Sequence, residues 1–142
     1  MKKILVTGGY GFIGSCFIIQ QINQGNKVVN LDKLTYAANL DNLKEIETNK
    51  NYSFQKGDIC DQTLVSKILK EFEIDWVANF AAESHVDNSI STPDIFIKTN
   101  VNGTLSMLNS SLGYWKGLDG EKKNNFRFLH VSTDDVYGSL GP

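Results

Sequence analysis

Three glycines near the amino terminus have the spacing of a turn that binds a diphosphate. Residues 7–14 read TGGYGFIG and contain G-x-G-x-x-G, starting at Gly9, as well as G-x-x-G-x-x-G, starting at Gly8. Backbone N–H groups at such a strand-to-helix turn can face an anion only where no side chain intervenes. A glycine triplet alone also fits an ordinary turn. Here it follows an apolar run and precedes a helical pattern, which is the context that dinucleotide binding requires.

A carboxylate follows the second apolar segment, where a dinucleotide site needs one. Asp32 stands 24 residues after Gly8. It could accept hydrogen bonds from the two hydroxyls of an adenosine ribose, and it would repel a 2′-phosphate. The sequence therefore predicts NAD rather than NADP, the alternative being an aspartate that only shapes a turn. Asp58 and Ile59, after the third apolar segment, are expected to border the adenine.

Hydrogen-bonding residues follow the fourth apolar segment. Ser84 and His85 come after two alanines that leave room for a cofactor, and both could contact a substrate. His85 fits the start of a helix equally well. His130 lies within the fifth apolar segment and is expected to be packed rather than catalytic.

Two adjacent carboxylates follow the fifth apolar segment. Asp134 and Asp135 come directly after Thr133. Like charges held close together separate the two pKa values, so that one carboxyl can donate a proton while the other accepts one. Elimination of water needs both forms at once. The alternative is an Asp-Asp turn on the surface.

The elements that must position these residues alternate along the chain. Apolar runs predict five strands, over residues 3–6, 27–31, 52–56, 75–82 and 126–132. Helical spacing predicts helices over residues 12–24, after an Asp61 cap, and over 93–112, with a polar connector at 113–125. This alternation predicts an α/β fold, a doubly wound parallel sheet in the order 3-2-1-4-5. Its carboxyl edge would bring all the candidate residues together.

Composition narrows the choice of partners. The 142 residues include 14 basic and 16 acidic ones, giving a net charge of −2, which argues against nucleic acid or an anionic membrane as partner. No apolar run approaches the roughly 18 residues of a membrane span. The two cysteines cannot form a disulfide framework, and the glycines at residues 8–9 interrupt any signal peptide. We expect one cytoplasmic NAD-binding domain over residues 1–142.

Six segments together resemble a known family. In chain order they are ILVTGGYGFIGS, NLDKLTYAANLDNL, KGDICD, NFAAESHVDNSI, TNVNGT and HVSTDDVYGSL. Their order and spacing resemble the N-terminal part of the dTDP-glucose 4,6-dehydratases, which are extended short-chain dehydrogenases/reductases. The resemblance implies an NAD-dependent lyase. Such an enzyme oxidises C4 of dTDP-glucose, eliminates water across C5–C6 and returns the hydride to C6.

The resemblance also implies roles for individual residues. Thr133 would position the C4 oxygen, Asp134 would be the general acid, and Asp135 stands where the base belongs. Ser84, His85 and Thr133 are the expected substrate contacts, and no metal is expected. Motif and resemblance together place these residues at the NAD site: Gly8, Gly11, Phe12, Ile13, Gly14, Asp32, Lys33, Leu34, Thr35, Asp58, Ile59, Phe80, Ala81, Ala82, Glu83, Ser84 and Thr99.

A homodimer is a further implication. Members of the family pair through the region of the helix predicted at residues 93–112. The apolar residues of this helix spread more widely than one buried stripe requires; they are Ile95, Val101, Leu105, Leu108 and Leu112.

The chain departs from the family pattern at several positions. Asp135 replaces the usual glutamate, Asn88 the usual arginine and Ala38 the usual glycine. The family also needs a Tyr-x-x-x-Lys pair on a helix, and only Tyr52 and Lys56 match that string. In the predicted strand they would be about 13 Å apart. We therefore expect a fragment without its substrate domain and with little turnover; the alternatives are a sugar-nucleotide epimerase or decarboxylase, or a non-catalytic NAD-binding module.

Overall fold

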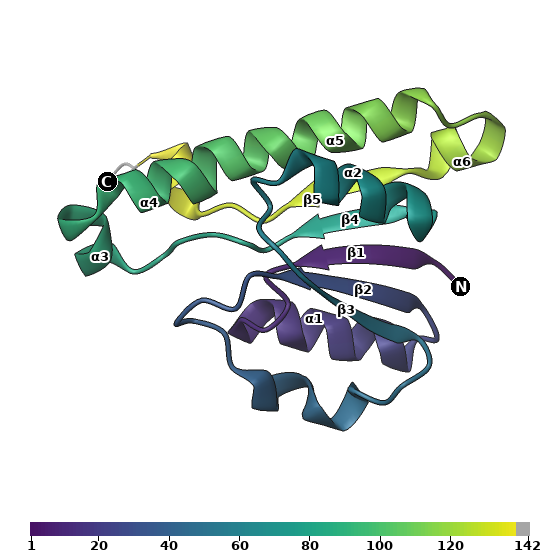
Figure 1. The fold of residues 1–142 in the computed structure, drawn as a ribbon, viewed down its shortest axis with the longest axis horizontal. Helices are drawn as coiled ribbons and strands as arrows, with labels where there is room; N and C mark the ends of the chain where they lie inside the picture. The colour runs from purple at the N-terminus through teal and green to yellow at the C-terminus, as the bar shows by residue number, and fades with distance from the viewer. Residues whose placement is uncertain (139–142) are drawn as a thin grey trace.

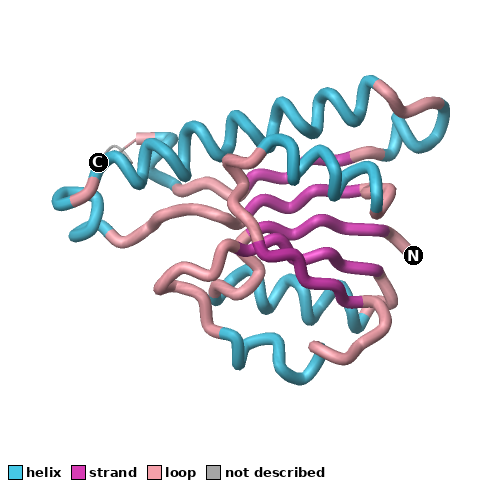
Figure 2. The backbone as a smooth tube through the Cα atoms, viewed as in Figure 1, coloured by secondary structure: helices cyan, strands magenta, loops and turns pink. Residues whose placement is uncertain are grey.

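The sheet has the predicted topology. The computed structural model describes residues 1–138, apart from the side chains of Val86, Asn88, Asp134 and Asp135. Five strands lie side by side and form one sheet (Figure 2). They are β1 (Lys3–Thr7), β2 (Lys27–Asp32), β3 (Tyr52–Lys56), β4 (Trp76–Asn79) and β5 (Arg127–His130). All are parallel, in the order β3-β2-β1-β4-β5, which confirms the doubly wound α/β fold.

Helices cover both faces of the sheet. α1 (Phe12–Asn23) and the 3-10 helix η1 (Leu40–Ile46) lie on one face, and α2 (Gln62–Glu71) and α5 (Thr104–Lys116) lie on the other (Figure 1). Residues of β1 alternate between the two cores: Ile4 and Val6 pack on the α1 side, and Leu5 packs on the α2 side. A strand buried on both faces has to be apolar throughout, which explains why β1 reads as a continuous apolar run.

Two local signals in the sequence correctly mark helix starts. The Asp61 carboxylate accepts a hydrogen bond from Leu64 N–H at 2.9 Å, so Asp61 caps α2 as predicted. Thr92 occupies the N-cap position of α4 (Pro93–Phe96), and Pro93 is its first residue.

The predicted long helix over residues 93–112 is wrong as a single element. α4 continues into a π-helix, η2 (Ile97–Gly103), and only then into α5, which extends to Lys116. The short helix α3 (Val86–Ser91) agrees with the alternative that His85 stands at a helix start, whereas α6 (Gly120–Asn125), within the expected polar connector, was not predicted. The π-turn adds a residue to the helical repeat and so rotates the chain between α4 and α5.

The last two strands are shorter than predicted. β4 spans Trp76–Asn79 instead of 75–82, because residues 80–82 leave the sheet at its carboxyl edge. β5 spans Arg127–His130 instead of 126–132. His130 was expected to be packed and is instead exposed, because β5 is the outermost strand of the described sheet.

The five apolar residues expected at a dimer contact are all exposed, at roughly half of their area. The Cys16 thiol on α1 is free and exposed, and that of Cys60 is free and half-buried. Within residues 1–138, none of the helices combines the length and the apolar character needed to cross a bilayer.

Candidate functional site

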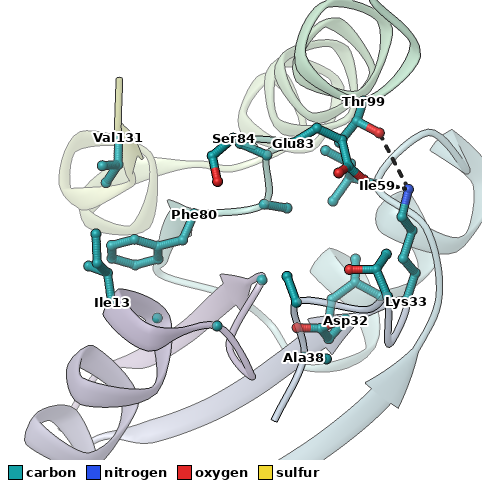
Figure 3. Close-up of a pocket in the computed structure, with 18 of the residues that line it drawn as sticks. Ile13, Asp32, Lys33, Ala38, Ile59, Phe80, Glu83, Ser84, Thr99 and Val131 are labelled. Atoms are coloured by element: carbon teal, nitrogen blue, oxygen red, sulfur yellow. Dashed lines mark hydrogen bonds and ion pairs between the residues drawn. The ribbon is translucent and has the colours of Figure 1, made fainter. Parts of the chain in front are cut away.

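A crevice of about 480 Å³ opens at the carboxyl edge of the sheet (Figure 3). Residues that follow all five strands contribute to its walls. Ile13, Phe80 and Val131 gather at one end, while Asp32, Lys33 and Ala38 lie at the other. The volume and the mixture of apolar walls with a few polar groups are typical of a small-molecule site.

The glycine turn forms one wall from backbone alone. Gly8 has φ of +68°, and a Cβ there would lie 2.8 Å from the backbone nitrogen of Ala81. A Cβ on Gly14 would lie 2.4 Å from the Gly8 carbonyl oxygen. Gly8, Gly11 and Gly14 line the crevice, whereas the Gly9 N–H donates to Asn30 Oδ1 at 3.1 Å on the inner side. The turn therefore follows the G-x-x-G-x-x-G spacing and directs the N-terminus of α1 at the cavity.

Asp32 lies on the floor of the crevice and shapes the turn beside it. The residue is 9% exposed; its Oδ2 accepts from Tyr10 N–H at 3.0 Å and its Oδ1 from Leu34 N–H at 2.8 Å. A carboxylate has about four acceptor positions, so each oxygen can accept a further donor from the cavity. Both interpretations of Asp32 made from the sequence, turn residue and ribose acceptor, are thus compatible with this geometry.

A charged cluster forms the end of the crevice near β2 and β3. Lys33 Nζ lies 3.7 Å from an Asp58 carboxylate oxygen and 3.9 Å from one of Glu83, and it donates to Thr99 Oγ1 at 3.3 Å. Partial burial raises the pKa of Asp58. A hydrogen bond from Cys60 N–H and the nearby Lys33 ammonium outweigh that effect, so the pKa lies below its ordinary value. The Asp58 carboxylate is therefore charged near neutral pH.

Glu83 connects the loop after β4 to this cluster. Its side chain is 8% exposed, and Oε2 accepts from the Tyr36 hydroxyl at 3.1 Å. Its backbone is held from η2: Glu83 N–H donates to Asn100 Oδ1 at 2.8 Å, and Asn100 Nδ2 donates to Glu83 O at 2.9 Å. The β4 loop is thus tied both to the β2 loop and to the π-helix.

A row of polar side chains crosses the carboxyl ends of β1, β4 and β5. The Thr7 hydroxyl donates to Asn79 Oδ1 and accepts from Ala81 N–H at 3.3 Å. Asn79 Nδ2 lies 3.0 Å from His130 Nδ1. Since Asn79 Oδ1 is already the acceptor for Thr7, its amide nitrogen is the donor toward the His130 ring. The row fixes the relative positions of the strand ends at the crevice.

Tyr52 and Lys56 are strand residues, which confirms that they are not a helical Tyr-x-x-x-Lys pair. The Tyr52 hydroxyl is buried beneath the glycine turn; it accepts from Asn30 Nδ2 at 3.0 Å and donates to the Tyr10 hydroxyl oxygen at 3.4 Å. Burial, followed by the bond with Tyr10, raises the pKa of Tyr52 above its ordinary value of 10.0. The Tyr52 hydroxyl therefore stays protonated near neutral pH, and its phenolate is not available to take a proton.

The crevice brings together the residues expected at the NAD site, all but Leu34, and also Thr133. Leu34 packs against the core under α1, and the His85 ring lies 5.4 Å from the Tyr36 ring instead of lining the crevice. The backbone of Asp134 and Asp135 begins the 3-10 helix η3 (Asp134–Tyr137), but their side chains lie outside the described structure.

Several lining residues were missed by the sequence reasoning: Leu31, Ala37, Ala38, Gly57, Val131 and Ser132. Most of them adjoin a predicted strand end, so position alone could have identified them. In the described part of the chain, no three His, Cys, Asp or Glu side chains are grouped so that they could hold a metal ion.

Comparisons with known proteins agree with this geometry. A family model described as GDP-mannose 4,6 dehydratase matches residues 5–142. The chain is 56% identical to dTDP-glucose 4,6-dehydratase of Xanthomonas campestris pv. campestris (strain B100), over 99% of this chain and 40% of that protein. It is 53% identical to dTDP-glucose 4,6-dehydratase of Escherichia coli, over 97% and 38%. The chain thus spans about 40% of the length of these curated relatives.

Solved structures show the same fold. The dTDP-glucose 4,6-dehydratase of Streptomyces venezuelae with NAD and TYD bound has a TM-score of 0.83 and 39% identity, over 99% of this chain and 42% of that one. The UDP-glucose 4-epimerase of Thermotoga maritima with UDP-glucose has a TM-score of 0.80 and 31% identity, over 99% and 41%. These similarities confirm the resemblance inferred from the sequence, and the chain belongs to the GDP-mannose 4,6 dehydratase family.

Proposed function

We propose that residues 1–142 form the NAD-binding part of an enzyme that dehydrates dTDP-glucose to dTDP-4-keto-6-deoxyglucose. A relative named dTDP-glucose 4,6-dehydratase is 56% identical to this chain. Among solved structures, a dehydratase with NAD bound is 40% identical, whereas an epimerase with UDP-glucose is 31% identical. This difference favours the dehydratase over the epimerase.

The crevice has a glycine turn suited to the diphosphate of NAD and side chains suited to its adenosine. Backbone atoms leave no room for a Cβ at Gly8 and Gly14, so the strand turns tightly and α1 packs close to it, while Gly11 presents no side chain to a diphosphate in the crevice. Asp32 can accept from the ribose hydroxyls, and Asp58 and Ile59 would border the adenine. When bound, NAD accepts a hydride from the substrate and returns it. The chain would bind the cofactor, orient it and exclude water from it.

The residues after β5 would carry out the acid–base steps of the reaction. Thr133 lines the crevice and would hold the C4 oxygen of the sugar through its hydroxyl. We assign Asp134 as the acid that protonates the leaving C6 hydroxyl, and Asp135 as the base that takes the C5 proton. Ser84, which also lines the crevice, would donate to or accept from a sugar hydroxyl.

The observation that carries this proposal is that Asp32 and the glycine turn line one crevice. It is tested by titrating NAD⁺ into the chain while the midpoint of thermal unfolding is followed. Ligand at 100 times its Kd stabilises the native state by about 2.7 kcal/mol, so the midpoint should rise by several degrees. NADP⁺ should raise it far less, because Asp32 repels a 2′-phosphate. An unchanged midpoint with saturating NAD⁺ would overturn the proposal.

The 142 residues alone should convert little dTDP-glucose. The oxidation of C4 needs a base, and the only Tyr-x-x-x-Lys string in the sequence is the strand pair with a raised tyrosine pKa. Formation of the 4-keto product by this chain at the rate of a complete dehydratase would contradict the assignment. If NAD⁺ binds without any turnover even in a longer gene product, the chain is a non-catalytic module.

We also propose that the protein pairs with a second copy through the exposed apolar residues of η2 and α5. Val101, Leu105, Leu108 and Leu112 form a stripe on the outside of these helices, with Ile95 before them. A contiguous apolar surface of this kind is typical of an interface. Light scattering of the longest available gene product should give twice the monomer mass, and a monomer would reject the pairing.

A further inference from the structure

The Asn100 side chain holds the loop after β4 through two hydrogen bonds of the kind that a neighbouring strand would make. Beyond Asn79 this loop has left the sheet, yet the N–H and C=O of Glu83 both have partners in the Asn100 amide, at 2.8 and 2.9 Å. A carboxamide offers one acceptor and one donor side with the spacing of a peptide group. Asn100 therefore satisfies a buried peptide at the point where the next strand no longer can.

The π-helix is what brings Asn100 to this position. Asn100 lies in η2, next to Thr99, whose hydroxyl accepts from Lys33 at the crevice (Figure 3). Two consecutive residues thus reach toward the same cavity wall. Single π-turns within α-helices are rare and concentrate at functional sites. The helical irregularity has a direct structural outcome here, since it orients this pair of polar residues.

The peptide that Asn100 holds belongs to the wall of the crevice. Ala82, Glu83 and Ser84 all line the cavity, and Figure 3 shows Glu83 and Ser84 at its edge. The Glu83 side chain is fixed separately by the Tyr36 hydroxyl at 3.1 Å. Of these contacts, only those of Asn100 fix the peptide itself, and hence the direction in which Ser84 leaves it.

We propose that Asn100 is a positioning residue of the cofactor site, acting through the Glu83 peptide to set the wall formed by residues 82–84. The inference rests on the proposed NAD-binding function and adds a residue to it. Asn100 itself does not line the crevice. Its substitution should therefore change the affinity for NAD⁺ without removing any group that touches the cofactor.

The test is Asn100→Asp, which keeps the shape and the acceptor for Glu83 N–H. Its second oxygen replaces a donor and faces the Glu83 carbonyl oxygen. At pH 8 the Kd for NAD⁺, measured by calorimetry, should rise roughly tenfold, as for a lost buried hydrogen bond. The nearby carbonyl oxygen and partial burial both disfavour the charged form of the new carboxyl, and its protonated form regains a donor. At pH 5.5 the ratio of variant Kd to wild-type Kd should therefore fall below about threefold.

Asn102→Asp is the matched control, because Asn102 is exposed in the same π-helix and the substitution adds the same charge. Its Kd should stay within twofold of wild type at both pH values. Each Kd is measured well below the unfolding midpoint of that variant at that pH, where the native state predominates, so that the ratio reports positioning and not folding. If N100D does not fold at pH 8, Asn100→Ser replaces it, with an expected loss of about fivefold that is equal at both pH values.

The failures are distinguishable. A wild-type chain that does not bind NAD⁺ overturns the proposed function and this role together. With wild-type binding intact, a Kd within twofold for N100D (or for N100S in its place) overturns the positioning role alone. A tenfold loss for N100D that persists at pH 5.5 overturns it as well.

Discussion

The two long walls of the crevice are built in opposite ways. The glycine turn is formed by consecutive residues, 8–14, and its close backbone packing is possible because its glycines have no side chains. The opposite wall joins Lys33 and Glu83 from distant parts of the chain, with Asn100 behind it holding the Glu83 peptide, and it depends on the presence of these side chains. Added atoms should therefore damage the first wall, while removed or exchanged atoms should damage the second.

The largest effect is expected where an atom is added to the glycine turn. Gly14→Ala places a Cβ 2.4 Å from the Gly8 carbonyl oxygen, which is backbone and can move only with the whole turn. We expect the free energy of unfolding to fall by about 3 kcal/mol, with NAD⁺ binding lost. Urea denaturation and the NAD⁺ titration measure the two effects.

Gly113→Ala is the matched control. Gly113 is an exposed residue of α5, and a Cβ there would meet no heavy atom of the described residues within 4 Å. The substitution should stabilise the helix by about 0.5–1 kcal/mol. If Gly14→Ala is as well tolerated as this control, the backbone account of the first wall is wrong.

A smaller effect is expected from removing a hydroxyl between the two walls. Thr7→Val preserves the volume of a fully buried side chain, but it leaves Asn79 Oδ1 and Ala81 N–H without this partner. We expect a loss of about 2 kcal/mol in the free energy of unfolding. Thr63→Val, at an exposed position of α2, should change it by less than about 0.5 kcal/mol. Equal values for the two variants would show that the row does not join the strand ends.

Tyr52 is one of the side chains that support the glycine turn, and its contribution to stability should depend on alkaline pH. The folded state holds Tyr52 in its protonated form, with a pKa raised above 10.0, while the unfolded chain ionises near that value. The stabilisation is therefore complete below pH 10 and is lost as the pH rises. If Tyr52 is still protonated at pH 11 in the folded state, its contribution to the free energy of unfolding is about 1.4 kcal/mol smaller at pH 11 than at neutral pH.

Tyr52→Phe isolates this contribution. The free energy of unfolding, taken from denaturation curves recorded between pH 8 and pH 11, should fall less steeply with pH for the variant than for wild type. At pH 8 the variant should be less stable than wild type, because Asn30 loses its acceptor. Parallel curves would mean that Tyr52 does not bury its hydroxyl under the turn.

The smallest effect is expected from Lys33, because Lys33 and its partner Asp58 are each about one-third exposed. Lys33→Met should raise the pKa of Asp58 toward its ordinary value, which carboxyl NMR titration would detect. The lowered pKa of Asp58 stabilises the fold above about pH 4, and this stabilisation is lost as the pH falls. Because water screens the pair, the variant should lose no more than about 0.5 kcal/mol at pH 7. An unchanged Asp58 titration would exclude Lys33 as a cause of its shift.

The difference between the walls also decides what the sequence could predict. The glycine turn and the Asp61 cap are local patterns, and the strand order follows from the alternation of elements. The helix over 93–112 was predicted as one piece because its outer apolar residues keep a helical repeat. The π-turn depends instead on polar contacts of Thr99 and Asn100 with Lys33 and Glu83, far away in sequence.

The end of β4 was misjudged for a related reason. Residues 80–82 are apolar and read as strand, but in the fold they line the crevice, and the backbone leaves the sheet after the Phe80 N–H bond to Thr7 O. An asparagine within a helix carries no local signal of its partner, so Asn100 could be found only from the structure. Thr7 and Asn79 were likewise hidden within apolar strands.

The central place of β1 has a consequence for synthesis. β1 is made before the other four strands of the sheet, and β2 covers one of its edges early, but its other neighbour, β4, begins only at Trp76. At about 5–20 residues per second, that second edge stays open on the ribosome for roughly 3–14 s. An apolar strand with a free edge is a template for pairing with other chains. Slower translation between the codons for Thr7 and Trp76 should therefore favour aggregation of the newborn polypeptide.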